Sequence, residues 1–316
     1  MNSLINLLTA AIRAGIPLLF GTTGEIITEK TGNMNLGVEG MMWLGAFFGF
    51  YAGLSTDSMI LSLLCAFLAG MGGALIYAVL TVSLRANQTV AGLALTIFGT
   101  AFANFFGLRM IEANGGFLPK LSPRLTALLS DKPIPVLGDI PYIGKLLFSH
   151  NILVYLGILI AVAAYIYMNK TRSGLRMRAV GEAPATADAA GIHISRTKYI
   201  HILLGGGVCG LGGAYLSLSF FGGQWQNLCV NGQGWIAVAL VIFANWNPVK
   251  AIVGTLLFGM FEVIRFRVDW LQIPAAFCDM LPYVITTVIL VVASIRKSRE
   301  RRQPEGCGNN YFREDR

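Results

Sequence analysis

The stretch MILSLLCAFLAGMGGALIYAVLTVSL, residues 59–84, contains no charged side chain. A helix needs about 20 consecutive apolar residues to cross the hydrocarbon core of a bilayer. In lipid the apolar surface of such a helix needs no protein partner to cover it, because the bilayer is its solvent. This stretch therefore predicts a membrane-spanning helix.

Six further segments are long and apolar enough to span a membrane. They are residues 4–23, 36–54, 89–108, 152–168, 199–221 and 280–295. Arg13, Glu39 and His201 are the only acidic or basic side chains within them. The composition agrees, because charged residues make up 13% of the chain, about half of the roughly 25% found in soluble chains. Seven spans are therefore predicted.

The segment from Gly234 to Ile264 has a different pattern. Two short apolar runs, residues 235–244 and 251–261, flank the turn signal Asn245-Trp-Asn-Pro248. Either both runs cross as tilted helices, which gives nine spans, or both enter and return, which gives seven. The predicted fold is an all-α polytopic membrane domain over residues 1–295, with about seven to nine transmembrane helices and short broken or re-entrant helices.

Basic residues predict the orientation of this bundle. With residues 169–198 and the C-terminus in the cytoplasm, most of the 24 Lys and Arg side chains lie inside. The net charge of +8 then reflects topology and gives no support to nucleic-acid binding. Residues 112–150 become an external loop, too rich in proline for a long helix. Residues 296–316 become a basic cytoplasmic tail, for which we expect disorder.

The chain shows no signs of disulfide or metal chemistry. Its five cysteines are scattered, and no CxxC pair occurs among them. They predict neither a disulfide framework nor a zinc site. Residues 1–20 lack a basic n-region and a small-residue cleavage site, so we expect a retained helix rather than a removed signal.

One short motif occurs twice. Gly70-Met-Gly-Gly-Ala74 is echoed by Gly210-Leu-Gly-Gly-Ala214. Transporters are often built from two related halves, which is one explanation. The better supported explanation is that small residues let membrane helices approach closely.

The second half of the 169–198 segment predicts a short helix. Pro184 suits the first helical turn, residues 185–190 are mostly good helix formers, and Gly191 suits the position beyond the helix end. A short helix between basic flanks could transmit force from a soluble partner. A solvated loop without a partner is an equally supported interpretation of the same residues.

Three motifs resemble those of the bacterial ABC importer permeases for branched-chain amino acids, simple sugars and nucleosides. They are Gly181-Glu-Ala-Pro184 with Ala187-Asp-Ala-Ala-Gly-Ile192, then Gly32-Asn-Met-Asn-Leu-Gly-Val-Glu-Gly-Met-Met42, and Gly234-Trp-Ile-Ala-Val-Ala239 leading to Trp246-Asn-Pro248. The resemblance runs from about residue 16 to 295, with the motifs in the order and spacing of the family. The first of the three resembles the family's coupling helix.

Two details refine this resemblance. The lead-in from Pro17 to Gly32, with Glu25 and Glu29, looks most like the nucleoside-uptake branch. Ala185-Thr186 departs from the family, whose members tend to carry a charged or larger residue there. This departure puts in doubt only which ATPase the chain fits.

The resemblance implies a transmembrane permease subunit of an ATP-driven importer for nucleosides. The alternatives are the same kind of permease for a simple sugar such as ribose, or for branched-chain amino acids. It implies a second permease subunit as a heterodimer partner, ABC ATP-binding subunits that hold ATP and Mg²⁺, and an external substrate-binding lipoprotein. It also implies a bacterial cell (inner) membrane. The ATPase-coupling residues would be Gly181, Glu182, Pro184, Asp188, Ala190 and Gly191.

No catalytic motif supports an enzyme. The nearest approach to a Walker A loop, Gly138 to Leu146, has five residues between its glycines instead of four and no Ser or Thr after Lys145. HExxH and GxSxG are absent from the sequence. We therefore expect no cofactor, metal or catalytic residue in this chain. Two hypotheses from other classes are a stand-alone ion-coupled transporter and a structural membrane protein.

Polar residues in the apolar segments are candidates for the substrate pathway. They are Asn33, Asn35, Glu39, Asn104, Trp225 and Asn227. An intramembrane acid such as Glu39 is costly unless it is paired or hydrated, which marks it as functional. A structural salt bridge from Glu39 to Arg13 is an equally supported alternative. For Asn104, a functional and a structural role are likewise equally supported. Trp225 could stack on a base, although a Trp anchor at the membrane interface is favoured over that role.

Overall fold

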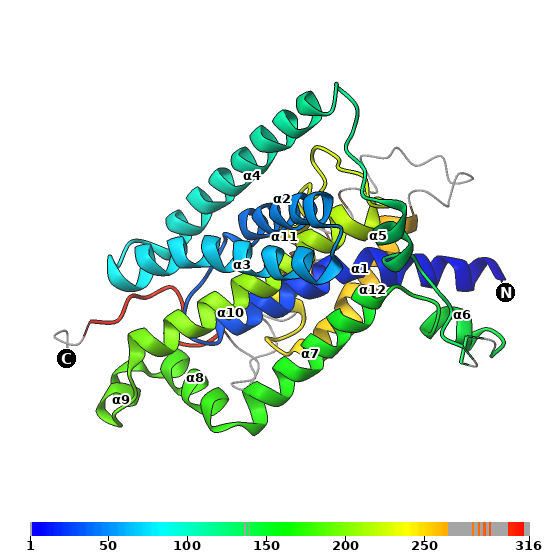
Figure 1. Cartoon of the computed structure of the whole chain (residues 1–316). Coiled ribbons are helices and arrows are strands. Elements are labelled where there is room, and N and C mark those ends of the chain that lie inside the picture. Colours follow the sequence, from blue (N-terminus) through cyan, green and yellow to red (C-terminus); the bar gives the residue numbers. More distant parts are fainter. Residues whose placement is uncertain are drawn as a thin grey trace.

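The computed structural model describes residues 2–135, 137–138, 140–264, 280, 284, 287–288, 291 and 303–312. The regular elements of this part are helices (Figure 1), with one isolated β-bridge between Lys120 and Gln224. The first half holds α1 (Asn2–Glu29), α2 (Val38–Thr56), α3 (Met59–Ala78), η1 (Val79–Ser83), α4 (Gln88–Ala113), α5 (Pro123–Leu128) and α6 (Ile143–Leu147). The second half holds α7 (Ile152–Lys170), α8 (Arg172–Glu182), α9 (Pro184–Ala189), α10 (Ile194–Tyr215), η2 (Leu216–Phe220), α11 (Gln233–Phe243) and α12 (Pro248–Ile264). The predicted all-α class is confirmed for the described residues.

Five helical segments among the described residues are long and apolar enough to cross a membrane. They are Leu4–Glu29, Met59–Ser83, Gln88–Ala113, Ile152–Lys170 and Ile194–Phe220, and each corresponds to one predicted span. The predicted span at 36–54 corresponds to α2, which has 19 residues and is largely buried. The predicted span at 280–295 lies outside the described residues except for isolated positions. The chain is thus a multi-pass membrane protein, and the total of seven to nine spans stays a prediction.

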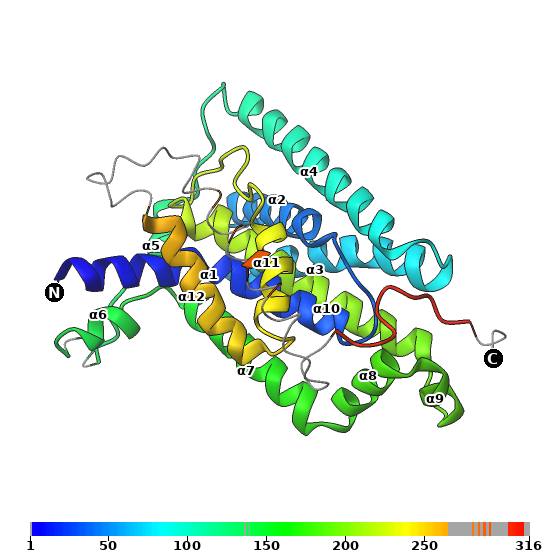
Figure 2. The same cartoon turned by 180° about the vertical axis from the view of Figure 1, so that it is seen from behind.

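The segment with two short apolar runs folds as two helices, α11 and α12, on either side of the predicted turn. α12 runs antiparallel to α1, since Gly15 lies against Thr255 and Gly259 against Ala11 (Figure 2). α11 covers only the second half of α1, where Thr22 Oγ1 donates to the carbonyl of Ala237 at 3.0 Å. α11 is therefore a half-length helix that starts inside the bundle.

The bundle has two ends that differ in what they carry (Figure 1). The α9 end holds α8, α9 and the start of α10, and the α5 end holds α5, α6 and the N-terminus. The described part of the C-terminal tail also lies at the α9 end, because Gly306 N donates to the carbonyl of Gly181 at 2.9 Å. The segments predicted to be cytoplasmic therefore share one end, while the membrane side that this end faces stays a prediction.

Glycines let the central helices approach one another. A Cβ on Gly70 of α3 would lie 2.2 Å from the carbonyl oxygen of Gly206 and 2.9 Å from the Cα of Gly210, both on α10. A Cβ on Gly213 would lie 1.8 Å from the carbonyl oxygen of Met42 on α2. The two copies of the glycine motif thus face each other across one helix contact. Close packing of the helices therefore explains why the motif occurs twice.

The prediction of a disordered tail was wrong for residues 303–312. This segment hydrogen-bonds to α8, to α9 and to the turn before α4. Pro304 is buried and Tyr311 packs against the small apolar cluster of Val180, Ala187 and Ile194. The charges that suggested disorder mostly flank this segment, whose own sequence is Gln303-Pro-Glu-Gly-Cys-Gly-Asn-Asn-Tyr-Phe312.

Candidate functional site

Glu39 holds the start of α11 inside the bundle. It lies in the first turn of α2 and is 5% exposed. Its carboxylate accepts hydrogen bonds from Gly232 N at 2.8 Å and Gly234 N at 2.7 Å, and from Trp43 Nε1 at 3.3 Å. The first amides of a helix have no partner within the helix and carry partial positive charge. Glu39 therefore caps α11 electrostatically, and this pairing offsets the cost of burying an acid.

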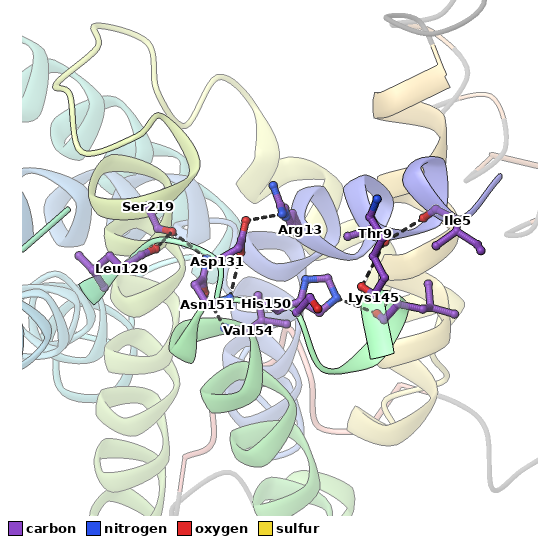
Figure 3. Close-up of polar contacts among 12 residues, drawn as sticks. Ile5, Thr9, Arg13, Leu129, Asp131, Lys145, His150, Asn151, Val154 and Ser219 are labelled. Atoms are coloured by element: carbon purple, nitrogen blue, oxygen red, sulfur yellow. Dashed lines mark hydrogen bonds and ion pairs between the residues drawn. The ribbon is translucent and has the colours of Figure 1, made fainter. Parts of the chain in front are cut away.

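The salt bridge considered between Glu39 and Arg13 does not form. Arg13 on α1 instead pairs with Asp131, which lies in the segment after α5 (Figure 3). Asp131 Oδ1 accepts from Asn151 N at 2.9 Å, and Asn151 Nδ2 donates to Ser219 Oγ at 2.8 Å. This network attaches residues 131–151 to α1 and η2 at the α5 end, where Arg13, Asp131 and Tyr215 line a cavity of about 400 Å³.

Two further acids, both on α1, are buried inside the bundle. Glu25 accepts from Asn35 N at 2.9 Å and from Asn35 Nδ2 at 3.2 Å. Glu29 accepts from the indole Nε1 of Trp246, beyond the end of α11. Sequence reasoning did not select Glu25 or Glu29 as site residues, although the rule for intramembrane acids applies to them once α1 is known to extend to Glu29.

The term polar layer is used here for Glu25, Asn33, Asn35 and Glu39, which lie in the linker between α1 and α2 and in the adjoining ends of these two helices. All four are buried. Asn33 is 0% exposed, and neither its amide oxygen nor its amide nitrogen has a hydrogen-bond partner among the described residues. A buried amide without a partner costs free energy, so it is the kind of group that a solute or water would satisfy.

The remaining pathway candidates lie away from this layer. Asn104 on α4 donates to the carbonyl of Thr100 in its own helix at 2.9 Å. Trp225 is fully buried beside the rings of Phe47 and Phe50, and its Nε1 donates to Asn227 Oδ1 at 3.3 Å. The indole thus lies in the interior of the protein. Contact of these residues with substrate stays a prediction.

A groove of about 600 Å³ lies between α2 and α4. Its walls are mostly aromatic, with Phe47, Phe48 and Tyr51 from α2 and Phe102 and Phe106 from α4. The Phe48 and Phe102 rings stack with centroids 5.7 Å apart. The polar layer is not among the residues that line this groove or the cavity at the α5 end.

The predicted short helix at 184–190 is confirmed as α9, with Pro184 in its first turn. Gly191 follows it with φ +80°, the left-handed conformation predicted for a glycine at that position. One face of α9 is exposed through Ala185, Thr186 and Ala189, and Ala190 beyond it is exposed as well. The helix presents a small, smooth surface at the tip of the bundle.

The residues before α9 are packed against the rest of the chain. A Cβ on Gly181 would lie 2.3 Å from the carbonyl oxygen of Lys30, so α8 touches the linker that leads to the polar layer. Glu182 is exposed and accepts from Glu305 N at 3.4 Å, and Asp188 accepts from the hydroxyl of Tyr311 at 2.9 Å. The structure thus brings Gly181, Glu182 and Asp188 together with the C-terminal tail, a contact that sequence reasoning missed. No group of three or more potential metal ligands occurs among the described residues.

Comparison with known proteins gives a consistent result. The family model described as "Branched-chain amino acid transport system / permease component" matches residues 6–293. The chain is 33% identical to the putative glucose ABC transporter permease protein TsgC13 of Haloferax volcanii, over 99% of both chains. It is 34% identical to the nucleoside ABC transporter permease protein NupC of Lactococcus lactis, over 87% of this chain and 88% of the other. It is 33% identical to the guanosine ABC transporter permease protein NupQ of Bacillus subtilis, over 87% of both chains. No solved structure matches the chain.

Proposed function

The chain belongs to the family of permease components of branched-chain amino acid transport systems, a non-catalytic subunit of an ABC importer, and from this premise we propose that its cargo is a nucleoside. The support is its similarity to the nucleoside permease NupC and the guanosine permease NupQ at 33–34% identity. A simple sugar is the second candidate, because the putative glucose permease TsgC13 is equally similar. Because the chain belongs to a family of ABC importer permeases, the hypothesis of a stand-alone ion-coupled transporter is rejected.

The proposed complex contains further subunits. The family implies an ATP-binding partner, which carries ATP and Mg²⁺, and a binding protein that delivers the solute. A second, related permease chain is proposed as the partner in the membrane, in keeping with the two guanosine permeases of Bacillus subtilis, NupQ and NupP, both of which this chain resembles. We propose that the protein lies in a cell membrane. The bacterial inner membrane is not specified, because the relatives come from Haloferax as well as from bacteria.

We assign to α9 the contact with the ATP-binding subunit. Its exposed small side chains at the tip of the bundle suit a helix that fits into a groove of a soluble partner. In this proposal the α9 end faces the cytoplasm, in agreement with the basic residues of the 169–198 segment. ATP binding and hydrolysis move α9, and the bundle alternates between outward and inward access.

Gly191→Ala tests this assignment. Alanine in the left-handed conformation costs about 1–2 kcal/mol, which should tilt or fray the end of α9. We expect nucleoside uptake by the complete transporter in membrane vesicles to fall about tenfold. Gly116→Ala is the matched control, since Gly116 also has a positive φ, +85°, with no atom within 4 Å of an added Cβ, but lies at the α5 end. Equal uptake by the two variants would refute the role of α9.

Competition experiments test the cargo. Uptake of labelled adenosine or guanosine by the complete transporter should be blocked by a tenfold excess of unlabelled nucleosides. Glucose, ribose and leucine at the same excess should leave at least about nine-tenths of the uptake. Labelled glucose that enters and is not displaced by nucleosides would reverse the ranking of the two candidates.

A further inference from the structure

At the α9 end, the tail residues 303–312 lie between α8 and α9 on one side and the turn before α4 on the other. These two parts otherwise have few contacts with each other. In Figure 1 this segment runs beside α8, α9 and α10 toward the start of α4. On one side Gly306 N donates to Gly181 O at 2.9 Å, and the Tyr311 hydroxyl donates to Asp188 Oδ2 at 2.9 Å. The tail therefore bonds to the C-terminal end of α8 and to α9.

On its other side the tail holds the turn that precedes α4. Asn310 Nδ2 donates to the carbonyls of Arg85 at 2.6 Å and Ala86 at 3.1 Å. Gln88 Oε1 accepts from Gly308 N at 3.2 Å, and the Arg85 guanidinium lies 4.4 Å from the centre of the Phe312 ring. One short segment thus bonds to α8, to α9 and to the beginning of α4.

The contact continues from Gln88 to the interior. Gln88 is 1% exposed, and its Oε1 also accepts from Met34 N at 2.7 Å. Met34 lies between Asn33 and Asn35 in the polar layer, and the Met34 carbonyl accepts from the hydroxyl of Tyr77 at 2.6 Å. A chain of packed and hydrogen-bonded groups therefore leads from α9 through the tail and Gln88 to the polar layer.

We propose that residues 303–312 are a positioning element that links α9 to α4 and to the polar layer, with Asn310 and Tyr311 as its positioning residues. The inference rests on the proposed role of α9. A helix that is pushed by an ATPase changes access through the bundle only if it is attached to other helices of the bundle. α9 is six residues long, and the tail joins it to a different part of the bundle than its own chain neighbours do. Without this link, ATP hydrolysis should continue and transport should fall.

Asn310→Asp and Asn309→Asp form the matched pair that tests the link. Both are nearly isosteric and add the same charge. At position 310 the carboxylate replaces the amide that donates to two carbonyls, whereas the side chain of Asn309 is exposed. In the complete transporter reconstituted in liposomes, we expect Asn310→Asp to lower the ratio of solute imported to ATP hydrolysed at least fivefold. ATP hydrolysis and subunit association should stay within about twofold of the parent, and Asn309→Asp should match the parent throughout.

Native Cys307 reports whether the tail is in place. Burial raises the pKa of its thiol to about 12, and only the thiolate reacts readily with a maleimide. Labelling of the peptide that contains Cys307, followed by mass spectrometry, should be slow in the parent and at least tenfold faster in Asn310→Asp. Tyr311→Phe removes the bond to Asp188 while keeping the ring, and it should lower the transport ratio without faster labelling.

The outcomes separate the link from the proposed function. An unchanged transport ratio in Asn310→Asp, or a lowered ratio with unchanged labelling, overturns the link. Loss of ATP hydrolysis or of subunits in that variant also overturns it, because the tail would then serve assembly alone. If Gly191→Ala has no effect, the assignment of α9 fails, and the link that rests on it fails as well. If Gly191→Ala lowers uptake while Asn310→Asp keeps the transport ratio of the parent, the link alone fails and the assignment of α9 stands. The solute used is whichever one the parent transporter imports, so the identity of the cargo does not enter the result.

Discussion

Glu39→Ala is expected to abolish solute uptake by the assembled transporter, with a loss of at least a hundredfold. The substitution leaves Gly232 N, Gly234 N and Trp43 Nε1 without their acceptor inside the bundle. An unsatisfied buried donor costs about 1–3 kcal/mol, and here three are created at once. The start of α11 should then move away from α2, which destroys the junction of a half-helix with the polar layer.

Uptake in vesicles and thermal unfolding of the purified transporter measure this effect. Glu39→Gln should be milder, because its amide oxygen replaces one carboxylate oxygen while its amide nitrogen faces a donor. Glu112→Ala is the control, since Glu112 is exposed at the end of α4 and its partner Arg109 lies 3.7 Å away. If Glu39→Ala retains uptake close to that of Glu112→Ala, capping by Glu39 is unimportant for transport.

Gly213→Ala is expected to prevent the permease from folding. The added methyl group would lie 1.8 Å from the carbonyl oxygen of Met42, so α2 and α10 would have to separate. Overpacking of this kind costs about 1–3 kcal/mol or more, and backbone atoms on both helices cannot turn aside as a flexible side chain could. We expect the yield of monodisperse permease in detergent to fall at least tenfold.

Gly72→Ala is the matched control within the other copy of the motif. An added Cβ at Gly72 meets nothing within 4 Å. Alanine there should be neutral or stabilise the helix by about 0.5–1 kcal/mol, because glycine loses more backbone entropy on folding. Size-exclusion chromatography with a fluorescent fusion compares the two yields. Similar yields for the two variants would contradict the contact between α2 and α10.

Local features of the sequence predicted most of the helices. Residues 59–84 and 152–168 are uninterrupted apolar runs, and each became a helix long enough to cross a membrane. Pro184 and Gly191 marked the two ends of α9, because proline has a fixed φ that suits the first helical turn and glycine readily adopts the left-handed conformation that ends a helix. Neither property depends on a distant contact. The family motifs likewise predicted an importer permease, which the comparisons show.

The partners of the polar residues were not predictable in this way. Glu39 accepts from Gly234, which is 195 positions away, and Glu29 accepts from Trp246, which is 217 positions away. Arg13 was considered as the partner of Glu39, yet it pairs with Asp131. A sequence shows that a buried acid needs a partner, but several candidates meet that need equally until the helices are placed.

For the C-terminal tail as well, contacts with distant segments decided a feature that the local sequence did not predict. Over residues 296–316, charge and polarity suggested disorder, but within 303–312 the backbone amides and the Asn310 and Tyr311 side chains find acceptors on the bundle. By itself, then, the sequence determined the membrane class, most of the helices and the family, because hydrophobic length, turn residues and motifs are properties of neighbouring residues. The tertiary structure alone decided which acid caps which helix and what the tail holds, because hydrogen bonds between distant segments depend on how the helices pack.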